Sequence, residues 1–126
     1  MAKPTFLIVD DHDAFRAAAR GLLLRRGFLV VGESATGLAG IEAASRLRPD
    51  VVLLDVQLPD IDGFETARVL LATPAPPAVV LISTRDAADY GARIRASGVL
   101  GFITKSRLSG DTLSALLRGS TEGERT

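Results

Sequence analysis

Five short apolar runs alternate along this chain with segments of helical periodicity, and this alternation limits the fold more than any other feature. The runs lie at residues 5–9, 28–33, 51–55, 78–83 and 100–104 and are rich in Val, Ile, Leu and Phe. Their apolar residues do not alternate with polar ones, which is typical of strands buried on both faces, as in a parallel sheet. The pattern therefore predicts a parallel sheet with right-handed crossovers and helices on both of its faces.

The segments between the runs carry apolar residues at helical spacing. The predicted helices span residues 14–26, 38–47, 63–72, 87–96 and 111–118. The chain is thus a β-α unit repeated five times. Five strands suit the flavodoxin-like strand order 2-1-3-4-5 better than a six-stranded dinucleotide-binding fold. We therefore expect an α/β domain of the flavodoxin-like (βα)5 class.

The composition agrees with one folded domain and excludes several classes of protein. With 126 residues, of which 47% are hydrophobic and 24% charged, the chain can bury a core. Its formal net charge is zero, so no overall field draws it toward nucleic acid or an anionic membrane. It has no cysteine, which excludes disulfides and thiolate metal sites. No apolar stretch approaches the ~20 residues of a membrane span, and no signal peptide is recognisable, so we expect a cytoplasmic protein.

Polar residues follow the ends of four of the predicted strands. The first strand ends at Asp10 and Asp11, the third at Asp55, the fourth at Ser83 and the fifth at Lys105. In open parallel sheets, ligands bind beyond the carboxyl ends of the strands, near the point where the strand order reverses. In the order 2-1-3-4-5, three acids, a hydroxyl and a lysine therefore converge on one edge from segments distant in the sequence.

These converging groups suit phosphoryl transfer to a carboxylate. Three neighbouring carboxylates must hold protons or bind a cation, and all-oxygen ligation favours a hard ion such as Mg²⁺. A carboxylate beside Mg²⁺ can act as a nucleophile and form an aspartyl phosphate, and Asp55 is the central acid. Mg²⁺ and Lys105 would supply positive charge to the phosphoryl oxygens, and Ser83 would donate a hydrogen bond to them.

Four sequence motifs lie at these strand ends. They are VDDH at 9–12, LLDVQLPDIDGFE at 53–65, LIST at 81–84 and GFITKS at 101–106. In this order, and over nearly the whole chain (residues 4–119), they resemble the receiver domain of bacterial two-component response regulators. Details such as DDHDAFR after the first strand and KS after the fifth are similar to receivers that precede helix-turn-helix DNA-binding domains.

The resemblance implies a role for each residue of the acidic pocket. Asp55 would accept a phosphoryl group from a partner histidine kinase, and Lys105 would pair with Asp55 and then with the phosphate. Asp11, Asp55 and the backbone carbonyl of Gln57 would bind Mg²⁺ directly, while Asp10 would act through water. The bound cation and Lys105 would offset the repulsion between the acids.

The resemblance also implies a switch beside the pocket. Ser83 would follow the phosphoryl group after modification, and Phe102 would be the switch aromatic that turns inward when Ser83 moves. Pro59 and Gly63 would shape the loop after the acceptor, Gly63 by its backbone freedom.

Two positions depart from the family pattern. Thr84 stands where Ala or Gly is usual, and its bulk beside the phosphoryl group is expected to slow both phosphorylation and dephosphorylation. Ser106 stands where many receivers have proline, so a cis Lys-Pro bond is excluded and the loop that holds Lys105 could run differently.

Other polar residues near the pocket have simpler structural interpretations. Asp13 would start the next helix as a partner of the helix dipole, and His12 would be exposed there without binding a ligand. Asp60 and Asp62 would be turn and helix-capping residues.

These features predict a phosphorylation-dependent signalling switch. The domain would catalyse its own phosphorylation and slow dephosphorylation, and its output would be a conformational change instead of product turnover. One alternative is a receiver-like interaction module that works without phosphorylation. Another is a small phosphohydrolase that uses DHD at 11–13 as an Asp-x-Asp nucleophile pair.

The organisation of the chain predicts partners as well. We expect the receiver domain at residues 1–119 and a polar tail or the start of a linker at 120–126. The chain would be a stand-alone receiver or, as the linker-like tail favours, the N-terminal part of a longer transcription regulator. DNA would be bound only through such an output domain. The first, fourth and fifth predicted helices are the candidate surfaces for a homodimer.

Overall fold

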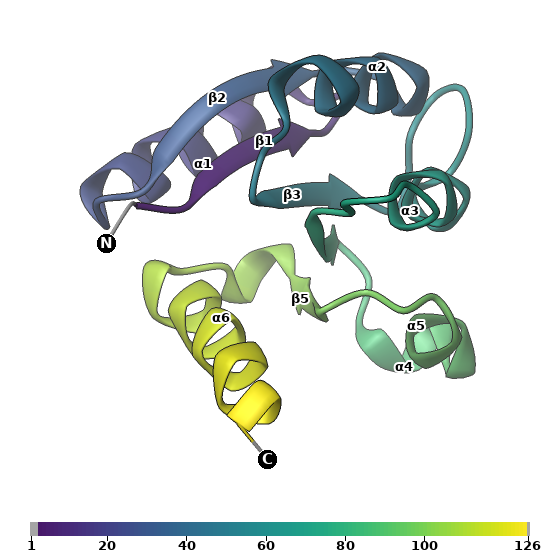
Figure 1. The fold of residues 1–126 in the computed structure, drawn as a ribbon. Helices are drawn as coiled ribbons and strands as arrows, with labels where there is room; N and C mark the ends of the chain where they lie inside the picture. The colour runs from purple at the N-terminus through teal and green to yellow at the C-terminus, as the bar shows by residue number, and fades with distance from the viewer. Residues whose placement is uncertain (1–2, 126) are drawn as a thin grey trace.

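Five parallel strands form one sheet in the order β2-β1-β3-β4-β5, which confirms the predicted topology (Figure 1). The computed structural model describes residues 3–125, with side chains described for residues 3–119. The strands are β1 (Thr5–Val9), β2 (Leu29–Ser34), β3 (Val51–Asp55), β4 (Ala78–Ser83) and β5 (Gly101–Thr104). The helices are α1 (Asp13–Arg25), α2 (Gly37–Leu47), α3 (Gly63–Leu71), α4 (Ala87–Tyr90), α5 (Ala92–Ala96) and α6 (Gly110–Arg125), with a 3-10 turn at Lys105–Arg107.

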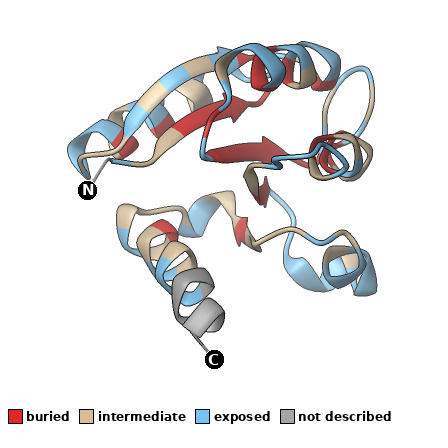
Figure 2. Cartoon of the chain, in the orientation of Figure 1, coloured by how far each residue is buried: buried red, intermediate tan, exposed pale blue. Residues whose placement is uncertain are grey.

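The sheet has one apolar layer on each face, because successive side chains of a strand point to opposite faces. On one face, Phe6 and Ile8 of β1 pack with Ala19 and Leu23 of α1 and with Leu113 of α6. Strand β4 is buried along almost its whole length, and so are β1 and β3, which are seen as red ribbon in Figure 2. Burial on both faces is the reason that these strands read as unbroken apolar runs.

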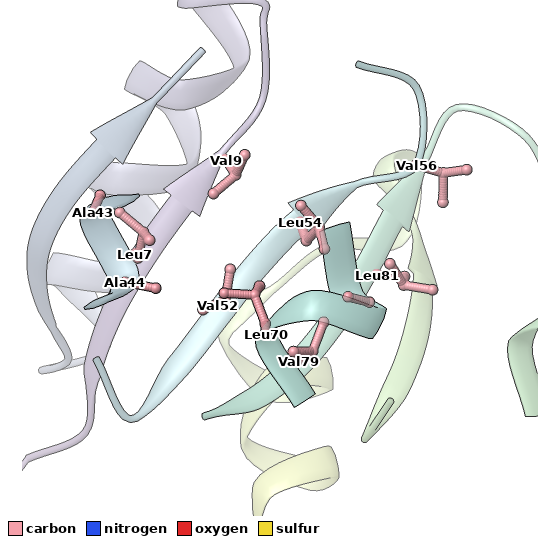
Figure 3. Packing of buried hydrophobic residues seen from close by; sticks show 11 residues of the cluster. Leu7, Val9, Ala43, Ala44, Val52, Leu54, Val56, Leu70, Val79 and Leu81 are labelled. Carbon is pink, nitrogen blue, oxygen red and sulfur yellow. The ribbon is translucent and has the colours of Figure 1, made fainter. Parts of the chain in front are cut away.

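The opposite face of the sheet packs against α2 and α3 (Figure 3). There Leu7 and Val9 of β1 lie in one cluster with Ala43 of α2 and with Leu54 and Leu70 of β3 and α3. The same cluster extends to Tyr90 and Phe102, which are half-buried at the edge formed by α4 and β5. No helix among residues 3–125 combines the length and the apolarity needed to cross a membrane.

The region predicted as one helix at 87–96 is divided in two. Gly91 has φ 58° and ψ −133°, which ends α4 at Tyr90 and separates it from α5. A capping box of Asp86 and Asp89 begins α4. The single-helix prediction is wrong at Gly91, because this glycine takes a conformation open to few other residues.

The last helix is longer than predicted. The predicted helix ends at residue 118, whereas α6 continues to Arg125. Most of the segment expected as a tail at 120–126 is therefore helical in its backbone, and its last residue lies outside the described residues.

Gly63 begins α3 against the end of β3, and its role is steric. A Cβ atom at this position would lie 2.4 Å from the carbonyl oxygen of Asp55 and 2.7 Å from the Cα of Val56. Its N–H also donates to the carbonyl of Val56 at 2.7 Å. The backbone of Gly63 is outside the left-handed region, so the predicted reason for this glycine, backbone freedom, is replaced by close approach to β3.

We expect Gly63→Ala to destabilise the domain by about 1–3 kcal/mol, because the added methyl group pushes α3 away from β3. Urea unfolding followed by circular dichroism measures this change. Gly119→Ala is the matched control, since a Cβ there meets no atom within 4 Å and alanine favours the helix. Equal stabilities of Gly63→Ala and the unmodified protein would contradict the steric role.

Candidate functional site

The strand register brings three of the predicted acids together at the carboxyl edge of the sheet. In the β1–β3 pairing, Val9 lies opposite Leu54, so the residues that follow them, Asp10 and Asp55, are neighbours. Both of these carboxylates are buried, at 0% and 2% exposure, while Asp11 stands exposed at the start of the next loop. The predicted convergence of the first and third strands on one acidic pocket is confirmed.

Lys105 lies between the two buried carboxylates. Its Nζ is 2.6 Å from Oδ2 of Asp10 and 3.4 Å from Oδ2 of Asp55, and its side chain is only 10% exposed. The ammonium group also lies 4.4 Å from the ring centroid of Phe15 in α1, a cation-π contact. The resemblance paired Lys105 with Asp55, and the structure adds a closer pairing with Asp10.

Lys105 begins a 3-10 turn that contains no proline. Ser106, the departure noted in the sequence, is exposed in that turn and leaves Lys105 directed at the acids. The turn therefore presents the lysine to the pocket despite the missing proline.

Asp55 is electrostatically unusual. Its pKa is raised from 3.8 to about 6, first by burial and then by the neighbouring charge of Asp10. Lys105 and the backbone N–H of Gln57, which donates to Oδ1 at 3.2 Å, act in the opposite direction. The balance leaves Asp55 ionised at neutral pH but easier to protonate than an exposed aspartate.

The pocket also fits a divalent cation. Asp10, Asp11, His12 and Asp55 each offer one ligand atom, and these four atoms lie within 4.8 Å of one another. Asp10 Oδ2 is buried without a hydrogen bond of favourable geometry, although Lys105 is close. Carboxylate oxygens in this number suit a hard ion, and a cation would relieve the repulsion between them.

His12 lies closer to the acids than the sequence suggested. Its side chain is 64% exposed, as expected, but Nδ1 lies 3.1 Å from Oδ1 of Asp10 and 3.2 Å from Oδ1 of Asp11. Its backbone N–H also donates to Oδ1 of Asp10 at 2.8 Å. The imidazole therefore borders the acidic pocket, a placement that the position directly after two acids could have indicated.

The acids further along the loops are structural. Asp13 is in the first turn of α1 and pairs with Arg16, and Asp62 caps α3 by accepting from the N–H of Glu65 at 2.8 Å. Asp60 caps a different helix, because its two oxygens accept from the N–H groups of Gly37 and Leu38 in α2. These hydrogen bonds lower the pKa of Asp60.

Ser83 lies at the end of β4 with its side chain fully buried. Its Oγ lies 2.7 Å from the hydroxyl oxygen of Tyr90 and accepts from the N–H of Arg85 at 3.1 Å. Sequence reasoning missed Tyr90, which it placed inside a regular helix. Thr84, the next residue after Ser83, is exposed just beyond the end of β4.

Phe102 and Tyr90 form part of a row of aromatic rings beside Ser83. The ring centroids of Tyr90 and Phe102 are 5.7 Å apart, and those of Phe64 and Tyr90 are 5.5 Å apart. Phe102 is half-buried here, with its ring against that of Tyr90.

This chain has relatives among known protein families and curated proteins. Residues 6–118 match the family described as the response regulator receiver domain. The response regulator GacA of Pseudomonas viridiflava is 36% identical over 100 residues, which are 79% of this chain and 47% of GacA. EvgA of Escherichia coli, a DNA-binding transcriptional activator, is 26% identical over 110 residues, 87% of this chain and 54% of EvgA.

The solved structures point to the same class. The signal receiver domain of NarL from Mycobacterium tuberculosis has a TM-score of 0.84 at 31% identity, over 96% of this chain and 98% of that one. The chain belongs to the response regulator receiver domain family, whose members are switches of two-component signalling. It spans about half the length of the curated relatives that it matches.

Proposed function

We propose that Asp55 is the phosphoryl acceptor of this receiver domain and that a histidine kinase is its phosphodonor. The observation that carries the proposal is the position of Asp55, a carboxylate with 2% exposure held between Lys105 and the acidic pocket at a sheet edge. Gly63 at the start of α3 packs directly against the backbone of Asp55. Family membership supports the same assignment.

The transfer is an exchange of one bond to phosphorus for another. A carboxylate oxygen of Asp55 attacks the phosphorus, and an O–P bond forms while the P–N bond of the kinase phosphohistidine breaks. The electron pair of the broken bond stays on the imidazole nitrogen, and no external oxidant or base is required. Lys105 Nζ, 3.4 Å from Asp55, stabilises the negative charge of the phosphoryl oxygens.

We infer that Mg²⁺ binds in this pocket, held by Asp11, Asp55 and the backbone carbonyl of Gln57, with Asp10 acting through water. The bound ion would neutralise charge on the phosphoryl group and on the carboxylates. The burial of Asp10 and Asp55 and the convergence of the ligand atoms support this assignment. The site residues themselves exclude bulk water from one side of Asp55 and hold its carboxylate in place.

The output is a change of conformation. Ser83 would turn to the phosphoryl group, and Phe102 would turn inward behind it. In a longer protein this change would control a helix-turn-helix domain and hence transcription, with dimers formed through α1 or through the helices that follow β4 and β5.

The proposal is tested with a small phosphodonor. The protein is incubated with acetyl phosphate and Mg²⁺, and intact mass measures the gain of one phosphoryl group. Asp55→Asn should abolish the gain, whereas Asp13→Asn, an exposed acid outside the pocket, should leave it unchanged. Equal modification of wild type and Asp55→Asn would refute Asp55 as the acceptor. No modification of either protein would also refute it and would favour a module that works without phosphorylation.

The geometry argues against the phosphohydrolase alternative. That mechanism requires Asp11 and Asp13 to act together, but the Asp13 side chain is 91% exposed and pairs with Arg16. Asp13 is also absent from the group of ligand atoms that converge on the pocket. Sustained hydrolysis of a generic phosphomonoester with Mg²⁺ would restore this alternative.

Thr84→Ala is expected to accelerate both phosphorylation by acetyl phosphate and loss of the phosphoryl group. Thr84 is exposed next to buried Ser83, and the family pattern puts this position beside the phosphoryl group, where its bulk would hinder a phosphodonor and water. Rates of modification and decay, measured by intact mass over time, report the effect. Unchanged rates in Thr84→Ala would show that this side chain does not restrict access.

A further inference from the structure

The hydroxyl of Ser83 forms hydrogen bonds with two groups other than Asp55. Its Oγ accepts from the N–H of Arg85 at 3.1 Å and shares a hydrogen bond of 2.7 Å with the Tyr90 hydroxyl. A buried hydroxyl has a single proton, and a phosphoryl oxygen can only accept. Where Ser83 is the donor of the bond to Tyr90, it can donate to a phosphoryl group on Asp55 only after that bond breaks. Where Tyr90 is the donor, the same bond still restrains the position of the Ser83 Oγ.

Tyr90 is held in place by rings on both sides. Its ring meets Phe64 edge-on at 64°, with centroids 5.5 Å apart, and meets Phe102 at 58°, with centroids 5.7 Å apart. The guanidinium of Arg93 lies 4.1 Å from the Phe64 centroid and continues this row into α5. A shift of the Tyr90 ring would thus change its contacts with Phe64 of α3 and Phe102 of β5, and through Phe64 the contact with Arg93 of α5.

Tyr90 is also the last residue of α4. The next residue, Gly91, has φ 58°, a backbone conformation that separates α4 from α5. Glycine can change its φ and ψ angles at low energetic cost, so Gly91 can act as a hinge directly after Tyr90. Loss of the hydrogen bond between Tyr90 and Ser83 can therefore allow α4 to move.

We propose that Tyr90 is a positioning residue that holds Ser83 in the unphosphorylated arrangement. Phosphorylation of Asp55 draws Ser83 away, breaks the bond to Tyr90 and frees the row formed by Phe64, Tyr90 and Phe102. The hydroxyl of Tyr90 thereby opposes activation by the free energy of one net hydrogen bond. This inference rests on the proposed function of Asp55 and adds to it a residue that sets the balance between the two states.

Tyr90 can be observed alone, since the chain has one tyrosine and no tryptophan. Protein labelled with 3-fluorotyrosine should give one ¹⁹F resonance from Tyr90, and beryllofluoride with Mg²⁺ serves as the phosphoryl mimic. We expect the resonance to shift when the mimic binds. Ser83→Ala, which removes the partner hydroxyl, should shift it in the same direction without any mimic.

Tyr90→Phe keeps the ring and removes only the hydroxyl. We expect it to bind beryllofluoride about two- to tenfold more tightly than wild type, the range that one net hydrogen bond allows. In the Ser83→Ala background the same substitution should have no effect, since the bond is already absent. A merely structural role of Tyr90 would lower stability in both backgrounds and leave the affinity for the mimic unchanged.

The outcomes separate this inference from the proposed function. Suppose that wild type binds beryllofluoride and Asp55→Asn does not, so that the proposed function holds. An unmoved ¹⁹F resonance, together with equal affinities of wild type and Tyr90→Phe, would then overturn the role of Tyr90 alone. Failure of wild type to bind the mimic at all would overturn both. A shifted resonance with tighter binding by Tyr90→Phe supports the role.

Discussion

Lys105→Met is expected to destabilise the domain by about 3–5 kcal/mol near pH 8 without divalent cations, the largest loss for any exchange of one side chain in the pocket. The ammonium group lies 2.6 Å from Asp10 and 3.4 Å from Asp55, both of which are buried. Methionine fills similar space against Phe15 but leaves two adjacent carboxylates without a counter-charge.

The loss should depend on pH and on metal. Lys105 lowers the pKa of Asp55, so without it the pKa rises above its present value of about 6. Near pH 5 Asp55 is then protonated in the variant, one charge is gone, and the destabilisation should shrink. Saturating Mg²⁺ should also recover part of the stability by replacing the missing positive charge.

Urea unfolding of wild type and variant at both pH values, with EDTA or with Mg²⁺, measures these effects. Arg107→Met is the matched control, since Arg107 is an exposed cation of the same 3-10 turn and forms no ion pair among the described residues. A loss in Lys105→Met that is equal at both pH values and unaffected by Mg²⁺ would mean that packing, and not charge, is the contribution of Lys105.

The sequence was sufficient to predict the sheet and the meeting of the acids. Strands β1 and β3 are buried on both faces, so their sequences are apolar throughout and end abruptly at Asp10 and Asp55. Parallel strands place such ends at one edge, and the order of the strands then makes them neighbours. Lys105 could be added because it too follows a strand directly.

The contacts of Ser83 could not be predicted in this way. Tyr90 is the last residue of the short helix α4, which ends at Gly91, and from there its hydroxyl lies 2.7 Å from the Oγ of Ser83. Apolar spacing over 87–96 continues across that glycine, so the pattern indicated one helix. A glycine at φ 58° and a glycine inside a helix look the same in a sequence.

The reason for Gly63 was also hidden. The family resemblance suggested that Gly63 supplies backbone freedom. In the structure, a Cβ atom added to this glycine would lie 2.4 Å from the carbonyl oxygen of Asp55. Close approach between a helix and a strand depends on how the two elements pack. Local sequence does not contain that information.

Asp55→Asn is expected to stabilise the metal-free domain by about 1–3 kcal/mol near pH 8, although it removes the acceptor. Burial, and then the charge of Asp10, raises the pKa of Asp55 from its ordinary value of 3.8 to about 6 in the folded state. Between these values the folded protein binds more protons than the unfolded chain. Wild-type stability should therefore fall as the pH rises from about 4 to about 6, and asparagine, which does not titrate, should escape this fall.

Urea unfolding with EDTA measures the difference in unfolding free energy between Asp55→Asn and wild type. This difference should grow as the pH rises from about 4 to about 6 and stay constant above that range. Asp13→Asn should show no such difference, because Asp13 is exposed beside Arg16. Mg²⁺ should then stabilise wild type more than Asp55→Asn, since the asparagine removes a charged ligand. A gap that does not change with pH would mean that Lys105 already compensates the charge of Asp55 in full, and the pocket would then have no electrostatic reason to attract a cation.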